Sequence, residues 1–254
     1  MLIEAKVAAA LATLSTATLS SVLLKKGLRN VWLRGALPLD PQQPRRFGRA
    51  FTLRFVPARE DLATPQSLAA AGSTRAAIEA MPAGAMAVVD AMGITDAGIF
   101  GDILCARMQQ RGVAGLISDG VVRDLAGVRA TGLPVWCRGA AAPPSLARLT
   151  FVAWQQPIGC GGVAVLPDDV VVADGDGAVV IPAAFLDEVV AIASEQERLE
   201  AWILGEVANG AALPGLYPPN AANLARHAAT VAAAARPAAE PGPAPPPADA
   251  EAKR

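Results

Sequence analysis

The sequence contains almost no histidine. Its 254 residues include a single one, His227, which lies close to the C-terminal end of the chain. The body of the chain therefore cannot hold a histidine-based zinc site, a Cys–His catalytic pair or a histidine general base. Any acid–base or metal chemistry must depend on carboxylates, arginine, lysine, hydroxyl groups or water.

Cysteines are also few, and the net charge is close to zero. The three cysteines, Cys105, Cys137 and Cys160, are an odd number and include no C-x-x-C pair. A disulfide framework is therefore not indicated, and we expect buried thiols in a cytoplasmic protein. The net charge is −1 at pH 7 and no basic cluster stands out, so we do not expect a nucleic-acid partner.

The chain also lacks a long uninterrupted apolar run. Val7–Leu24 is rich in alanine and leucine, but threonine and serine residues interrupt it. It is too polar for a membrane-spanning helix and has no clear cleavage site after a basic start, so we expect neither a membrane anchor nor a signal peptide. The pattern instead predicts two helices, Ala5–Leu14 and Thr16–Lys26, with Ser15 as the N-cap of the second.

The most informative part of the chain is Gly98–Gly132. A Gly-rich turn followed by apolar residues at helical spacing predicts a helix over Gly101–Gln110, which Arg111-Gly112 ends. Val113–Ser118 is a short apolar run between turn residues, which predicts a buried strand.

Three charged residues lie at the two ends of this helix–strand unit. Asp102 is in the first turn of the predicted helix, and Arg123-Asp124 follows the predicted strand. Ten helical residues rise ~15 Å and six strand residues return ~20 Å. The chain therefore goes out and comes back, and the three side chains should meet at one edge of a sheet.

Such a group of residues suits one kind of chemistry. Amides at a helix N-terminus bind a carboxylate, and an aspartate supplies hard oxygen ligands for Mg²⁺. An arginine stabilises negative charge that develops on an oxygen. Together these groups suggest a 2-oxo acid that is held on a metal and reacts through an enolate.

The spacing resembles that of a known family. Asp102, followed after about twenty residues by Arg123-Asp124 with Asp119-Gly120 just before, resembles the RraA-like family. That family includes divalent-metal 4-hydroxy-4-methyl-2-oxoglutarate aldolases, which also decarboxylate oxaloacetate. The resemblance covers roughly residues 10–220 and includes four further segments, Leu14–Leu19, Pro157–Val163, Asp174–Pro182 and Gly215–Pro219.

The resemblance implies a fold and an assembly. The mixed helix and strand pattern predicts a single α/β domain over residues 1–220, and the family fold is an α-β-β-α sandwich of swivelling-domain type. The family assembles as homotrimers or homohexamers with active sites between subunits. Residues 221–254 are rich in Ala and Pro and are predicted to be a disordered tail. Where the family usually has Pro-Gly-Asp, this chain has Pro167-Asp168-Asp169, and Asp tolerates such a turn at some cost.

The resemblance also implies roles for the site residues. Asp124 would bind the metal, Mg²⁺ or Mn²⁺, Arg123 would contact the substrate carbonyl and steady the enolate, and Asp102 would orient a water. A glutamate on the C-terminal helix of a neighbouring subunit would help to hold the metal. The candidates are Glu195, Glu197 and Glu200, of which Glu197 is preferred. The substrate carboxylate would be held by the loop amides of Gly98, Ile99, Phe100, Gly101, Asp102, Ile103 and Leu104.

Each of these residues has an ordinary structural alternative. Asp124 could be the N-cap of the next helix, which is worth about 1 kcal/mol, and Arg123 could form a surface ion pair. Asp102 could merely complement the helix dipole. Asp119 is interpreted as a turn aspartate rather than a ligand contact.

Two functions from different classes follow. The first is a metal-dependent class II pyruvate aldolase that cleaves a 4-hydroxy-2-oxo acid to pyruvate, with oxaloacetate decarboxylation as a side activity. No lysine lies beside the motif, which argues against a Schiff-base aldolase. The alternative is a non-catalytic regulator that binds a ribonuclease, like the RraA members of the family.

Overall fold

The computed structural model describes residues 3–234. The chain divides into two compact units, with the boundary between Glu197 and Arg198. The first unit contains every strand of the described part. The second contains the end of one helix and the whole of another. The predicted domain boundary at residue 220 stays a prediction.

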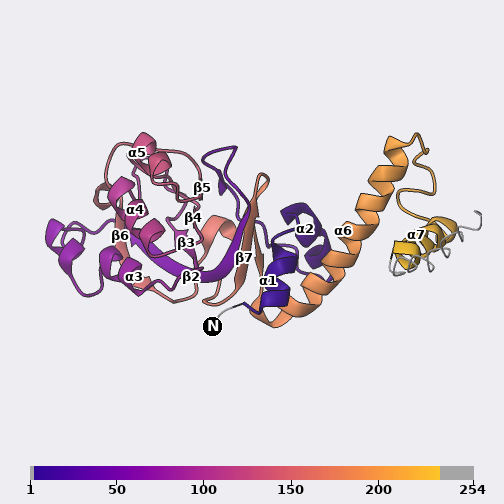
Figure 1. The fold of residues 1–254 in the computed structure, drawn as a ribbon. Helices are drawn as coiled ribbons and strands as arrows, with labels where there is room; N and C mark the ends of the chain where they lie inside the picture. The colour runs from indigo at the N-terminus through magenta and orange to yellow at the C-terminus, as the bar shows by residue number, and fades with distance from the viewer. Residues whose placement is uncertain (1–2, 235–254) are drawn as a thin grey trace, which may run out of the picture. The chain divides into compact units, whose positions relative to one another are not determined.

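One mixed sheet of eight strands forms the frame of the first unit (Figure 1). The order is β1-β5-β4-β3-β2-β7-β8, and β6 pairs with β2. Strands β2 to β5 run parallel to one another, whereas β1, β6, β7 and β8 pair antiparallel with their neighbours. The strands are β1 Leu37–Pro38, β2 Arg46–Pro57, β3 Met86–Asp90, β4 Gly115–Ser118, β5 Val135–Cys137, β6 Leu149–Trp154, β7 Val170–Asp174 and β8 Gly177–Ile181.

Helices cover the sheet on two sides. Helices α3, α4 and α5 pack on one face of β2 to β5, and α1, α2 and the first part of α6 pack on β7 and β8. The other faces of β3 to β5 and of β7 and β8 share a third apolar cluster. The helices are α1 Ala5–Leu11, α2 Thr16–Lys25, α3 Thr74–Ala80, α4 Asp102–Gln110, α5 Leu125–Ala130, α6 Leu186–Ala208 and α7 Ala221–Ala234. This layering is the predicted α-β-β-α sandwich, so the predicted fold class is confirmed.

Strand β3 is covered on both faces, which explains why its sequence is an unbroken apolar run. Ala87 and Val89 enter the cluster under the helices, whereas Met86 and Val88 enter the cluster between the two halves of the sheet. Because successive side chains point to opposite faces, a strand covered on both faces needs apolar residues at every position. The same covering explains why the middle of β2 is buried on both faces.

The N-terminal helices agree with the prediction at their junction. The Ser15 side chain accepts a hydrogen bond from the Thr18 amide at 3.0 Å, as expected of an N-cap. No single helix within residues 3–234 has the length and apolar character to cross a membrane. The pair α1 and α2 meets these criteria only when taken together, with a bend of 109° between them.

One prediction on the rest of the chain needs correction. The predicted disordered tail begins too early, since α7 occupies Ala221–Ala234. Alanine is the best helix former, and Asn220 Oδ1 accepts from the Asn223 amide where the helix begins. The remaining tail, 235–254, lies outside the described residues.

Candidate functional site

The candidate site forms where the chain leaves the carboxyl ends of β3 and β4. The segment after β3 returns as Gly98–Gly101, and the segment after β4 runs beside it. The Ile99 amide donates to Val121 O and the Arg123 amide donates to Phe100 O, both at 2.9 Å. This pairing brings Arg123 and Asp124 to the start of α4, beside Asp102. The predicted meeting of the three charged residues is confirmed.

Two glycines allow this close approach. A Cβ atom on Gly98 would lie 2.7 Å from Arg123 Cβ, and one on Gly101 would lie 2.7 Å from Asp124 Oδ2. At Gly98 the distance is too short for any larger residue, because Cβ and backbone atoms cannot easily move. At Gly101 a larger residue would push the Asp124 carboxylate aside. The glycines of the motif are therefore needed for contact with Arg123 and Asp124, and not only as turn residues.

Asp124 does not act as a helix cap. It occupies the N-cap position of α5, but its side chain accepts no capping hydrogen bond. Its backbone is left-handed, with φ 55° and ψ 49°, a conformation that costs a non-glycine residue about 1–2 kcal/mol. The carboxylate, about half exposed, is thus left available at the surface of the site.

Arg123 carries an unsatisfied donor. Its Nε lies 3.3 Å from Asp124 Oδ2, which is an ion-pair distance, yet the two groups are too poorly aligned for a hydrogen bond. The Nε atom is itself buried and has no hydrogen-bond acceptor in the described part of the chain. Buried donors normally have a partner, so this N–H is suited to receive an anionic oxygen.

Asp102 is held between α4 and α5. Its Oδ1 accepts from the Ile103 amide at 2.7 Å. A Cβ atom on Gly127 would lie 2.9 Å from Asp102 Oδ2, so α5 can pack on this carboxylate only because position 127 is glycine. The position of Asp102 therefore depends on α5 as well as on its own helix.

The predicted carboxylate-binding amides are fewer than expected. The Gly98 amide donates to Pro143 O and the Ile99 amide to Val121 O, so backbone pairing already uses both. The Ile103 amide donates to Asp102. For Phe100, Gly101, Asp102 and Leu104, no acceptor for the amide is found within residues 3–234. These four amides are the ones available to a substrate carboxylate.

Asp119 has a structural role, in line with the turn interpretation. It is 4% exposed and accepts from the Ala91 amide at 2.8 Å and from the Gly161 amide at 3.1 Å. Burial raises the pKa of Asp119, and these amide hydrogen bonds oppose the rise. The carboxylate ties the Gly-rich segment 157–163 to the two loops that form the site.

Glu197 makes a contact within its own chain. Its Oε1 accepts from the Ser15 amide of the same chain at 2.9 Å, at the N-terminus of α2. Burial would raise the pKa of Glu197, but hydrogen bonds from Ser15 and Thr18 and the nearby Arg45 outweigh it and lower the pKa. The role of Glu197 as a metal ligand to a neighbouring subunit stays a prediction. Glu195 and Glu200 lie on the same helix.

The donor set fits a hard cation with few protein ligands. Within residues 3–234, no three His, Cys, Asp or Glu side chains are gathered around a common point. A closed zinc site is therefore absent from this part of the chain. Mg²⁺ commonly takes one or two carboxylates and completes its shell with water and substrate oxygens, and Asp124 fits that pattern.

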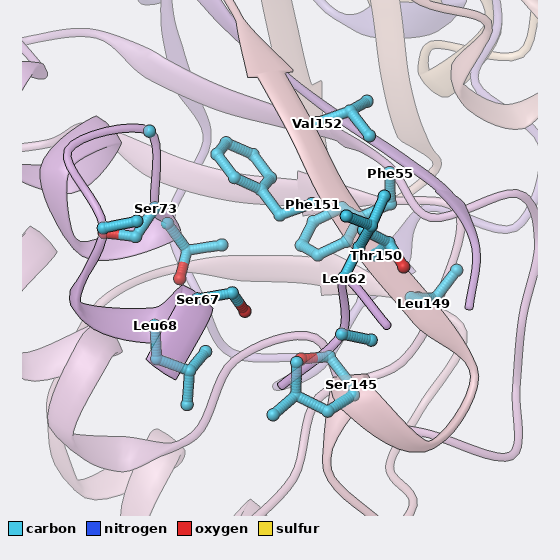
Figure 2. Close-up of a pocket in the computed structure, with 15 residues that line it drawn as sticks. Phe55, Leu62, Ser67, Leu68, Ser73, Ser145, Leu149, Thr150, Phe151 and Val152 are labelled. Carbon is cyan, nitrogen blue, oxygen red and sulfur yellow. The ribbon is translucent and has the colours of Figure 1, made fainter. Parts of the chain in front are cut away.

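A separate cavity lies nearby (Figure 2). It has a volume of about 240 Å³ and is lined by residues of the segment 62–74 and of Ser145–Val152, without an ionisable side chain. Phe55 in its wall packs edge-on against Phe100 of the site loop, with 6.5 Å between ring centroids. The cavity does not include Asp102, Arg123 or Asp124, so it is distinct from the candidate site.

Known proteins resemble this chain in sequence. A protein of Halalkalibacterium halodurans, provisionally named 4-hydroxy-4-methyl-2-oxoglutarate aldolase, is 38% identical over 109 residues, which are 42% of this chain and 50% of that protein. Protein DlpA of Legionella pneumophila is 31% identical over 65% of this chain and 27% of its own length. The chain thus spans half or less of these two relatives.

Solved structures resemble the whole fold. RraAS2 of Streptomyces coelicolor, described as an unusual member of the RNase ES inhibitor RraA family, is 35% identical with a TM-score of 0.72, over 80% of this chain and 97% of that chain. An uncharacterised protein of Pseudomonas syringae pv. tomato is 28% identical with a TM-score of 0.73, over 85% and 99%. The model of the RraA-like family, described as Aldolase/RraA, matches residues 13–180. The chain therefore belongs to the RraA-like family.

Proposed function

We propose that this protein is a divalent-metal-dependent class II pyruvate aldolase that cleaves a 4-hydroxy-2-oxo acid such as 4-hydroxy-4-methyl-2-oxoglutarate. The observation that carries the proposal is the arrangement of Arg123 and Asp124 beside the start of α4. Arg123 has a buried N–H without an acceptor, and Asp124 has a carboxylate that caps no helix. The aldolase name of the H. halodurans relative agrees with this reading.

Substrate binding would use the α4 N-terminus. The amides of Phe100 and Gly101 and the positive end of the helix dipole suit the carboxylate of the 2-oxo acid. This would place the adjacent 2-oxo oxygen toward Arg123. Asp124 would hold Mg²⁺ or Mn²⁺, which when bound would polarise the 2-oxo group.

The reaction requires two proton transfers, one from the 4-hydroxyl group and one to C3. As the C3–C4 bond breaks, the 4-hydroxyl loses its proton, C4 becomes a carbonyl and the electron pair passes to the 2-oxo oxygen as an enolate. The Arg123 guanidinium would stabilise that negative charge. A water held by Asp102 would accept the hydroxyl proton and return a proton to C3, which yields pyruvate. Decarboxylation of oxaloacetate would pass through the same enolate.

Lysine chemistry is less suited to this chain. In the part of the chain that the structure describes, the lysines are Lys6, Lys25 and Lys26, all on α1 or at the end of α2. Lys26 forms an ion pair with Glu188 at 2.5 Å, and Lys25 donates to Gln196 at 3.1 Å. These partners lie on α6, which supports a metal enzyme over a Schiff-base enzyme.

The test is pyruvate release from oxaloacetate and from 4-hydroxy-4-methyl-2-oxoglutarate, with Mg²⁺ and then with EDTA. We expect turnover that EDTA abolishes, that Asp124→Ala removes, and that Arg123→Lys lowers by about 10²-fold. The matched control is Asp61→Ala, because Asp61 is an exposed aspartate in the loop after β2. Absence of turnover with both compounds in the folded, Mg²⁺-loaded protein would overturn the proposal.

A second function has one specific observation in its favour. The S. coelicolor structure, which is described as a member of an RNase inhibitor family, matches 80% of this chain. A protein-binding regulator would hold a ribonuclease without turning over 2-oxo acids. Ribonuclease inhibition that survives Asp124→Ala, together with no pyruvate release, would favour this alternative.

A further inference from the structure

A second, larger cavity lies at the opposite edge of the sheet from the candidate site. Its volume is about 510 Å³, which is within the usual range for a small-molecule site. It is bounded by Phe47–Phe51 at the start of β2, by Pro82–Ala85 just before β3, and by Ile3 and Ala8 near the N-terminus. The candidate site follows the carboxyl ends of parallel strands, so the two sites are separate.

The cavity lies where β2 changes its partner. On one side, β2 pairs with β7 over Arg46–Arg49 and with β6 from Leu53 onward. Between these two stretches, the Ala50 amide donates to Asp169 O at 2.7 Å. The Asp168 amide donates to Ala50 O at 3.2 Å, and the Gln155 amide donates to Thr52 O at 2.9 Å. The two partner strands diverge here, which opens the space.

Both residues that bridge this gap are conformationally strained. Gln155 has φ 52° and Asp168 has φ 70°, and both line the cavity. Within residues 3–234, the other non-glycine residues with positive φ are Met92 and Asp124. Asp124 belongs to the candidate site. Strain of this kind gathers at binding and catalytic sites, because the surrounding structure must hold it in place.

Arg49, which lines the cavity, has a side-chain donor without a partner in the described part of the chain. Arg49 lines the cavity, and its Nη1 donates to Asp168 O at 2.9 Å. Its Nε is buried and has no acceptor in the described part of the chain. A carboxylate oxygen would satisfy this donor with a charge-assisted hydrogen bond.

The other residues that line the cavity indicate which chemical class of ligand it can bind. Phe47, Phe51 and Pro82 offer apolar surface, which suits an aliphatic or aromatic tail. Asp168 also lines the cavity, and its negative charge would repel a dianion such as a phosphate ester more than a monoanion. We propose that this cavity binds a small monocarboxylate with an apolar tail, with its carboxylate on Arg49.

The experiment is calorimetric titration of the full chain with octanoate, 1-octanol and octyl phosphate. We expect octanoate to bind more tightly than the other two ligands. Arg49→Gln should weaken octanoate binding by about tenfold or more, because it removes a charge-assisted hydrogen bond. Arg54→Gln, an exposed arginine on the same strand, is the matched control and should change nothing. Arg123→Gln should also leave octanoate binding unchanged, which excludes the candidate site as its location.

Two further variants guard against a folding defect. Ala8→Phe should block octanoate by filling the cavity, whereas Asp168→Asn should strengthen octyl phosphate binding by removing a like charge. A gain in binding cannot come from misfolding. Equal affinity for octanoate and 1-octanol, or octanoate binding that Arg49→Gln leaves intact, would overturn the proposal.

Discussion

At the scale of single residues, glycines determine how closely the charged groups of the candidate site approach one another. Gly101 admits the carboxylate of Asp124, and Gly127 admits that of Asp102. Neither position has a positive φ, so neither glycine is required by its own turn. The requirement comes from a neighbour that is distant in sequence.

A first prediction follows from Gly127, which lies inside helix α5. Gly127→Ala should lower the kcat for pyruvate release by about tenfold or more, because the new methyl group displaces Asp102. Stability should fall little, since alanine favours the helix by about 1 kcal/mol. Gly205→Ala is the control, because its added Cβ meets nothing within 4 Å. Unchanged turnover in Gly127→Ala would contradict the assigned position of Asp102.

A second prediction concerns Asp119, the buried carboxylate between the site loops. Asp119→Ala should reduce the free energy of unfolding by about 1–3 kcal/mol, because the Ala91 and Gly161 amides lose their acceptor. Denaturant unfolding of both proteins would measure the difference. Asp176→Ala, at the exposed β7–β8 turn, should cost far less. Equal costs for the two variants would show that Asp119 does not hold the loops.

At the scale of elements, the start of α2 joins two distant parts of the chain. Ser15 caps the helix with its side chain, and its own amide donates to Glu197 of α6, 182 residues away. The lowered pKa of Glu197 makes this junction sensitive to acid.

The third prediction is a pH dependence at this junction. Because the pKa of Glu197 is lower in the folded protein, its contribution to stability is complete above the ordinary pKa of 4.5. It is lost as the pH falls through the lowered value. Glu197→Gln should therefore be less stable than the parent near pH 7, and the difference should shrink in acid. Chemical denaturation across pH would measure it, with Glu60→Gln as an exposed control. A stability difference between Glu197→Gln and the parent that stays constant with pH would contradict the proposed role of the Glu197 carboxylate.

At the scale of the whole molecule, a metal that binds only the folded state should stabilise it. The fourth prediction is that Mg²⁺ raises the thermal midpoint, by the equivalent of about 2.7 kcal/mol at one hundred times its Kd. Asp124→Ala should abolish this gain and Asp61→Ala should retain it. The measurement needs no substrate, so it separates metal binding from turnover. A gain that is equal in both variants would place the metal elsewhere.

The sequence by itself determined the elements around the site. The Gly-rich turn, the helical spacing and the apolar run placed α4 and β4 within two residues of their observed bounds. These are local signals, because caps, turns and periodicity depend on neighbours in the chain. The order of these elements predicted that Asp102 would lie near Arg123 and Asp124.

The tertiary structure determined the features that local sequence patterns cannot predict. Asp124 looked like a helix cap in sequence, yet its left-handed backbone directs the carboxylate away from that role. Glu197 could be matched with Ser15 only once α6 packed beside α2. The cavity at Arg49 exists because β6 and β7 diverge from β2. Each result depends on contacts between segments far apart in the chain. The periodic spacing of apolar residues in a sequence does not predict such contacts.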